Sequence, residues 1–325
     1  MLRPCFLVAL IGVLSVLPAQ GKDLLVPDPF PTLEEAFAAL EDGDRIVISP
    51  GSYATAPLAS SGISFSLIGK GGRDSTTLRP VDPAQEKILY LDGGGGSIAV
   101  RGITFDSREG ANNLYGLVLR LADIAVEECR FMGGSGVDVD SCSGSVRGSE
   151  FLRNFDGLRI AGSPLHIENN IFTEVALGAL RVRGSEAQIF LNRFYRVDYC
   201  CISVVGKKNT PVIGGSPGKG NAFVEAGGVI VANHSKNDIN AQYNYWGAAT
   251  ALMEQMGYPA NLPEIQDQWD ESPRPLGTVD YRNWLQSEDE IGAGGSGRFP
   301  LAVVIVIGVA VVLLLLLIRR KKAHA

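Results

Sequence analysis

An aromatic residue that recurs about every 22 residues is the feature that most constrains the fold of this chain. It stands at positions 105, 131, 151, 172, 194, 223 and 246, and in the first five repeats an aliphatic residue precedes it by five positions. Most intervals also carry a second short alternating strand, as in residues 136–139 and 157–160. Short strands separated by Gly and Asn at this period predict an all-β parallel solenoid with one coil per repeat.

Four successive repeats place an asparagine two residues before the aromatic, at Asn170, Asn192, Asn221 and Asn244. Inward asparagines stacked at equivalent turns satisfy their amides from the coils above and below. We therefore interpret this row as a structural ladder rather than as a row of catalytic groups.

Charges alternate along one predicted strand face, through Arg101, Glu127, Arg147 and Glu168 in consecutive repeats. Neighbouring strands lie about 4.8 Å apart. The alternation therefore predicts ion pairs between coils, each worth about 0.2–1 kcal/mol at a surface.

The ends of a solenoid expose unpaired strands and need a cover. Residues 32–35 match a capping box, and the apolar residues that follow have helical spacing, so we predict a short amphipathic helix over the first coil. A strand is predicted at residues 45–49. At the other end, the side chains available to cover the last coil are Met253, Trp269 and Trp284.

Both termini are apolar. Residues 1–21 have a basic residue, an apolar run and small residues at the −3 and −1 positions, which predicts a secretory signal peptide. Residues 301–318 are eighteen apolar residues without a charge, and as a helix they would span about 27 Å. The basic residues 319–322 follow at once, so the positive-inside rule predicts a single-pass membrane protein with a cytoplasmic C-terminus.

The expected domain layout follows from these segments. It comprises a signal peptide (1–21), an extracytoplasmic ectodomain (22–290), a Gly-rich spacer (291–300), a transmembrane helix (301–318) and a basic tail (319–325). Within the ectodomain we expect an N-terminal cap (22–53), coils (about 54–247) and a C-terminal cap (248–290). The C-terminal pattern also resembles bacterial sorting signals that are cleaved beside the span, so retention and processed release both remain open.

The expected ectodomain is strongly acidic. Residues 22–297 contain 23 Lys and Arg against 35 Asp and Glu, a net charge of −12. Because nucleic acid and anionic bilayers repel such a surface, we expect no nucleic-acid partner.

Motifs at both ends of the repeat resemble a known family. Residues 31–36, 43–48 and 50–53 look like the N-terminal cap of pectin-lyase-like proteins, and residues 244–247 with 277–285 are similar to the closing coil of many secreted members. The resemblance covers residues 24–286 and implies a single-stranded right-handed parallel β-helix. The family includes polysaccharide lyases, hydrolases, periplasmic proteins of nitrous-oxide reductase maturation and surface proteins with no known reaction, so it implies no particular activity.

The hydrolase signatures of that family, Asn-Thr-Asp, Asp-Asp and His-Gly, are missing. A lyase would need Ca²⁺ held by carboxylates and an Arg or Lys base. The candidates for such a patch are Asp138, Asp140, Asp156, Arg159 and Arg181. The competing interpretation pairs Asp138 with Arg159 and Asp140 with Arg120 across coils, as ordinary ion pairs.

The predicted ectodomain holds four cysteines. Cys129 and Cys142 belong to one coil, and Cys200 and Cys201 lie three coils further on, about 14 Å away. A disulfide needs Cα atoms within about 7 Å, so a bridge between the two sets is excluded. A Cys129–Cys142 bridge, a strained vicinal ring and four buried free thiols all remain open.

The sequence thus predicts a membrane-anchored β-helix module that binds carbohydrate or a surface partner without catalysis. The alternative is a polysaccharide lyase or glycoside hydrolase acting on acidic glycans. No cofactor is predicted, and calcium enters only under the lyase alternative. His166 and His234 are too few and too far apart for a zinc or copper cluster.

Overall fold

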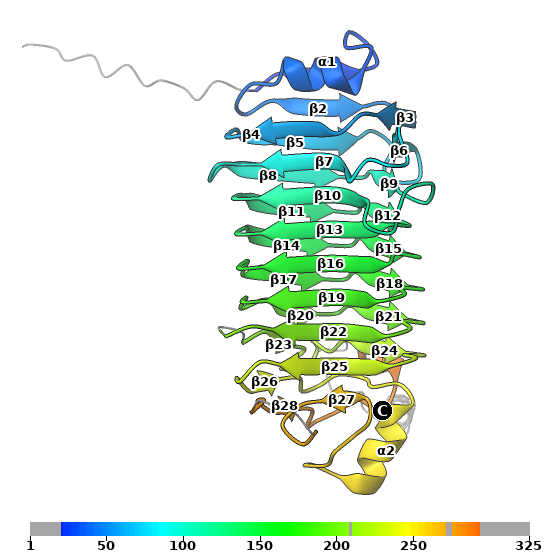
Figure 1. Cartoon of the computed structure of the whole chain (residues 1–325), viewed down its shortest axis with the longest axis vertical. Coiled ribbons are helices and arrows are strands. Elements are labelled where there is room, and N and C mark those ends of the chain that lie inside the picture. Colours follow the sequence, from blue (N-terminus) through cyan, green and yellow to red (C-terminus); the bar gives the residue numbers. More distant parts are fainter. Residues whose placement is uncertain (1–20, 208–209, 271–274, 293–325) are drawn as a thin grey trace, which may run out of the picture.

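The computed structural model describes residues 21–207, 210–270 and 275–292, which form a tall stack of parallel strands (Figure 1). The predicted signal peptide (except residue 21), most of the spacer, the predicted transmembrane helix (301–318) and the basic tail lie outside these residues. Among the helices within them, none is long and apolar enough to cross a bilayer.

The described strands form three parallel sheets, and each coil adds one strand to each sheet in turn. The eleven-stranded sheet contains β1 (Asp23–Val26), β2 (Arg45–Ile48), β5 (Phe65–Gly69), β8 (Ser97–Arg101), β11 (Asp123–Glu127), β14 (Ser143–Arg147), β17 (Leu165–Glu168), β20 (Gln188–Phe190), β23 (Val212–Ile213), β26 (Ile239–Asn240) and β28 (Val279–Asp280). The nine-stranded sheet contains β4 (Leu58–Ser61), β7 (Lys87–Asp92), β10 (Tyr115–Arg120), β13 (Ser135–Asp140), β16 (Asp156–Ala161), β19 (Gly178–Arg183), β22 (Cys200–Val205), β25 (Val229–His234) and β27 (Ile265–Gln266). The eight-stranded sheet contains β3 (Gly51–Thr55), β6 (Thr76–Pro80), β9 (Thr104–Asp106), β12 (Arg130–Met132), β15 (Glu150–Leu152), β18 (Ile171–Thr173), β21 (Arg193–Tyr195) and β24 (Ala222–Val224). This arrangement is a parallel β-solenoid, as the repeat predicts.

The recurrent aromatics form one continuous stack inside the solenoid. Six phenylalanines and Trp246 follow one another with ring centroids 4.5–5.3 Å apart, and all are buried. Glycines of the nine-stranded sheet face the stack. At Gly136, for example, a Cβ would lie only 2.9 Å from the ring of Phe151, so a larger residue would not fit. The large ring on one sheet therefore occupies the space that the glycine on the other sheet leaves open, and the core is closely packed.

The asparagines form a hydrogen-bonded ladder at the turn between the eleven- and eight-stranded sheets. The side-chain oxygen of Asn192 accepts from the backbone N–H of Asn170 at 3.0 Å and from its side-chain amide at 3.1 Å. The oxygens of Asn221 and Asn244 accept in the same way from the preceding coil. Ser149 extends the ladder, since its hydroxyl accepts from the backbone N–H of Cys129 at 3.2 Å.

The N-terminal end is covered by α1 (Leu33–Ala38), which the capping box predicts. The Thr32 hydroxyl accepts from the backbone N–H of Glu35 at 3.2 Å, which satisfies one free donor of the first turn. The strands β1, β2 and β3 already belong to the sheets, so the stacked strands begin earlier than residue 54.

The C-terminal end contains a helix that the repeat pattern does not predict, α2 (Ala249–Met256), followed later by the short 3₁₀ helix η1 (Glu288–Glu290). Met253 is fully buried and Trp284 packs against the core, as expected of covering residues. The prediction for Trp269 is wrong, because half of its surface is exposed. Its backbone N–H donates to Asp267, and this turn holds Trp269 at the surface.

All four described cysteines are buried free thiols, so neither bridge within a set forms. Cys129 and Cys142 follow strands of two different sheets and therefore lie at different corners of their coil. Burial raises the pKa of the Cys129 thiol to about 12 and that of Cys200 to about 11, so both stay protonated at neutral pH.

Candidate functional site

The outward side of the nine-stranded sheet, which we call the nine-stranded face, carries all five candidate residues. Asp138, Arg159 and Arg181 stand in one column, on β13, β16 and β19. Asp140 lies in the column on one side and Asp156 in the column on the other. The repeat register therefore places these side chains on the face that the sequence predicts.

The ion pairs on this face differ from the predicted ones. Arg120 pairs diagonally with Asp138, with its Nη2 2.5 Å from the carboxylate oxygen Oδ2. Asp140, directly opposite Arg120 in the register, instead accepts a hydrogen bond from the Ser141 hydroxyl at 2.9 Å. The predicted Asp140–Arg120 pair is therefore wrong, because the long Arg120 side chain reaches past Asp140 to Asp138. The predicted direct contact between Asp138 and Arg159 is also wrong, although, against the effect of burial, the charge of Asp138 still raises the pKa of Arg159.

Arg159 turns toward an aromatic side chain instead. Its guanidinium donates a hydrogen bond to the Tyr115 hydroxyl, and its central carbon lies 5.8 Å from the centroid of that ring. Cation and ring together make an outward-facing polar and aromatic surface.

Asp156 is the most buried of the candidate carboxylates, with 6% of the residue exposed. Its Oδ1 lies 3.0 Å from the Nε of Arg181. Burial raises the pKa of the Asp156 carboxyl, although Arg181 and Arg159 favour its charged form. Gly178 leaves room for this pair, because a Cβ there would come within 2.7 Å of the Arg181 Nε.

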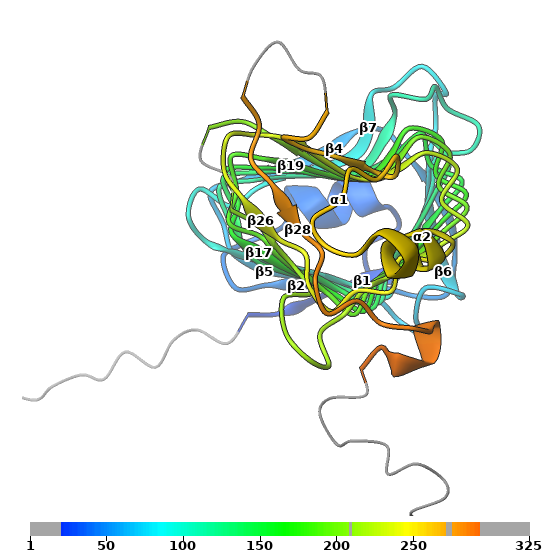
Figure 2. The same ribbon diagram turned by 90° about the horizontal axis from the view of Figure 1, so that it is seen from below.

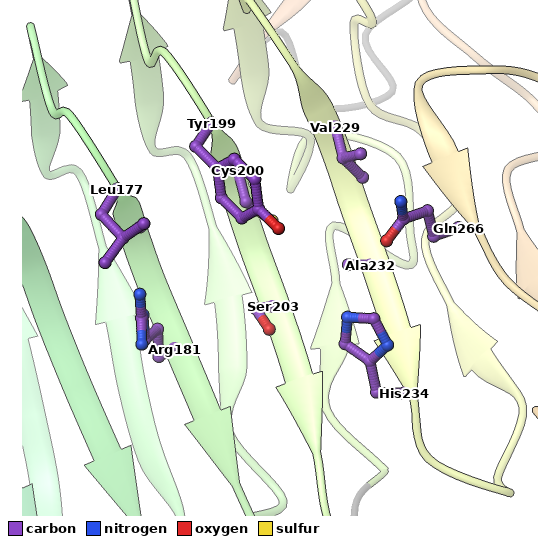
Figure 3. A pocket seen from close by; sticks show the side chains of 10 residues that line it. Leu177, Arg181, Tyr199, Cys200, Ser203, Val229, Ala232, His234 and Gln266 are labelled. Carbon is purple, nitrogen blue, oxygen red and sulfur yellow. The ribbon is translucent and has the colours of Figure 1, made fainter.

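A pocket of about 370 Å³ opens beside this pair, toward the C-terminal end of the face (Figure 3). Its lining residues come from β19, β22, β25, β27 and the turns before the first two of these strands: Leu177, Gly178, Arg181, Tyr199, Cys200, Ser203, Val229, Ala232, His234 and Gln266. Tyr199 has 65% of its surface exposed at the rim. The pocket thus combines one aromatic side chain with several hydrogen-bonding groups, which together can orient a small ligand.

Of the ten lining residues, the sequence predicts only Arg181 as a site residue. Ser203, Ala232 and Gln266 continue the column of Arg159 and Arg181 on the next three strands. The repeat register extends to Ser203 and Ala232, whereas Gln266 lies beyond the last repeat and carries no such signal. Tyr199 stands in a turn, outside the alternating pattern, and no repeat signal marks it.

The three aspartates do not fit a calcium site. Among the residues that the structure describes, no group of three or more His, Cys, Asp or Glu side chains is placed to hold a metal ion. Asp138 and Asp156 each lie against an arginine, and the cation would repel Ca²⁺, which requires several oxygen ligands around one point.

Comparisons with known proteins add little to this geometry. No protein-family model matches the chain, and no curated protein matches it. A solved structure of ORF18 of Geobacillus virus E2 aligns with 77% of this chain and 57% of its own, at 11% identity and a TM-score of 0.32. The chain thus spans less than two thirds of that protein, and a similarity this low supports no conclusion about fold or activity.

Proposed function

We propose that this chain is a non-catalytic surface module that binds an extended carbohydrate along the nine-stranded face, with one end of the ligand in the pocket. The pocket carries the proposal, because Tyr199 stays exposed beside Arg181, His234 and Gln266. Aromatic rings and arginines dominate binding energy at recognition sites. The column of Arg159 and Arg181 continues the polar surface outward from the pocket.

The pairing of the charged side chains on this face favours binding without catalysis over lyase or hydrolase activity. Asp138 and Asp156 each have an arginine partner, and a guanidinium stays protonated in proteins and makes a poor base. Glycoside hydrolysis needs two carboxyl groups that converge on one bond. The lyase alternative rests on Asp156 alone, as the buried carboxyl with a raised pKa.

We expect Tyr199→Ala to weaken ligand binding about tenfold, because it removes the aromatic ring that lines the pocket. A polysaccharide panel would first identify the ligand by calorimetry, and the same samples would be assayed for new unsaturated or reducing ends. Tyr258→Ala, at a tyrosine beyond α2, is the matched control and should leave the affinity unchanged. Binding without new ends supports the proposal, whereas cleavage of any panel member would overturn its non-catalytic part.

We further propose that the solenoid winds to the right and belongs with the pectin-lyase-like proteins. Right-handed connection is the strong preference for parallel strands joined across a core. The capping and closing motifs at residues 31–53 and 244–285 support the family assignment. A surface protein is the runner-up ligand on the same face.

We also propose that residues 301–318 anchor the module to a membrane with its ectodomain outside. Eighteen apolar residues are long enough to span the bilayer as a helix, and the four cations that follow favour a cytoplasmic C-terminus. Truncation before Phe299 is expected to convert a protein that pellets with membranes into a soluble secreted one, which fractionation and immunoblotting would measure. If expression of the full-length sequence already yields a soluble protein that lacks residues 299–325, the chain is released by processing rather than anchored.

A further inference from the structure

The eleven-stranded sheet presents a second surface, on the side of the solenoid away from the nine-stranded face (Figure 2). Its outward side carries what we call the charge column, which consists of Arg101, Glu127, Arg147 and Glu168 on β8, β11, β14 and β17. The register aligns each residue with the next, so the signs alternate along the solenoid at the strand spacing of about 4.8 Å.

The charges of this column are only weakly engaged within the chain. Arg101 pairs with the turn residue Glu128 at 3.0 Å rather than with Glu127, and more than half of both side chains is exposed. Arg147 Nε lies 3.8 Å from Glu127. Exposed pairs of this kind contribute about 0–1 kcal/mol, so these side chains can be shared with another surface at little cost.

The side chains in the neighbouring outward column, which we call the low column, are short, so another surface can approach closely there. The low column contains Ala99, Ala125 and Ser145 before it reaches His166. Apolar residues bound the charge column at both ends, with Ile68 on β5 and Phe190 on β20. Lys219 borders the Phe190 end, 5.1 Å from the ring centroid.

A twofold axis in the plane of such a face can run in two directions, with opposite electrostatic results. An axis along the charge column places each coil opposite the same coil of the second copy, so arginine faces arginine and glutamate faces glutamate. An axis along the strands, midway between β11 and β14, reverses the order of the coils. Arg101 then faces Glu168 of the second copy, and Glu127 faces its Arg147, so every contact joins opposite charges.

The same reversal also matches the residues around the charge column. Ile68 comes to face Phe190, which pairs two apolar side chains. In the low column, Ala125 comes to face Ser145, so the centre of the contact stays shallow. Charge therefore selects the reversed arrangement, and the neighbouring side chains are compatible with it, since an isologous interface sets the same patch of both copies together.

We propose that two copies of this chain associate face to face through the eleven-stranded sheet, with their solenoids antiparallel. The six matched strands, from β5 to β20, are about 10–16 Å long and offer roughly 400 Å² of flat surface per copy. A total of about 800 Å² belongs to the smallest class of contacts, so the dimer is reversible and leaves both nine-stranded faces free.

Charge swaps on the full-length chain in detergent test the arrangement, with sedimentation equilibrium as the measurement. Glu127→Arg and Arg147→Glu each create two like-charge contacts across the axis and should weaken dimerisation at least tenfold. The double variant restores opposite charges at every contact and should dimerise again. An equimolar mixture of the two single variants should form a heterodimer, in which all contacts are complementary.

The controls separate this interface from other causes of association. Arg153→Glu changes a charge at a turn of a different sheet and should leave dimerisation unchanged. Association through the apolar residues 301–318 would be indifferent to all of these charge swaps, and that result overturns the proposal. A monomeric wild-type chain overturns it too, as does a double variant that stays monomeric. Thermal melts verify folding, and Glu127→Gln and Arg147→Gln serve as milder variants if a charge reversal unfolds the chain.

Discussion

Asn192→Leu is expected to lower the free energy of unfolding by about 3 kcal/mol, because it leaves several buried polar groups without a partner. The Asn192 side-chain amide donates to the carbonyl of Ile167 at 2.8 Å, and its oxygen accepts from the backbone N–H of Asn170 at 3.0 Å. Leucine can replace neither bond, and the site is fully buried, so water cannot replace them either. Denaturant unfolding followed by circular dichroism measures the change.

The matched control for this substitution is Asn240→Leu, at an exposed asparagine on β26. We expect it to change the free energy of unfolding by less than about 0.5 kcal/mol, the usual size of a surface effect. Equal effects of the two substitutions would contradict the ladder as a source of stability.

Phe172→Ala is expected to cost about 3–5 kcal/mol, the range for removing a buried aromatic side chain. The ring lies 4.5 Å from that of Phe151 and 4.9 Å from that of Phe194, measured between centroids. The small residue facing it is Gly157, where a Cβ would lie 3.1 Å from the ring, so this position offers no side chain that could fill the cavity.

Thermal or denaturant unfolding of Phe172→Ala would be compared with that of Phe155→Ala, since Phe155 lies outside the stack and is partly exposed. The control should cost much less. A loss below about 1 kcal/mol in Phe172→Ala would show that the stack relaxes around the gap and would contradict a tightly packed core.

The parallel solenoid was predictable because the repeat sets the register directly. The stacked aromatics Phe131, Phe151 and Phe172 are Cα partners in the sheet, as their spacing requires. Successive side chains on a strand alternate between the two sides of a sheet, so the repeat also indicates which residues point outward. This is why Asp138, Arg159 and Arg181 could be assigned to one face.

The ion pairs were not predictable to the same degree, because register specifies Cα neighbours and not the direction of long side chains. Arg101 forms an ion pair with Glu128 rather than with Glu127, and Arg120 pairs with Asp138 rather than with Asp140. Similarly, α2 lies outside the repeat and buries Ala249 and Met253 against a surface that only the folded coils create.

The sequence by itself determined the stack of parallel strands, its aromatic core, its asparagine ladder and the side of the sheet on which each candidate residue lies, because these follow from a repeated local pattern. Only the tertiary structure decided where a pocket forms. Tyr199 enters it from a turn, His234 from the end of β25 and Gln266 from a strand that returns to the sheet after α2. Their meeting depends on the conformations of turns and on a long-range excursion of the chain, and a local repeat carries no information about either.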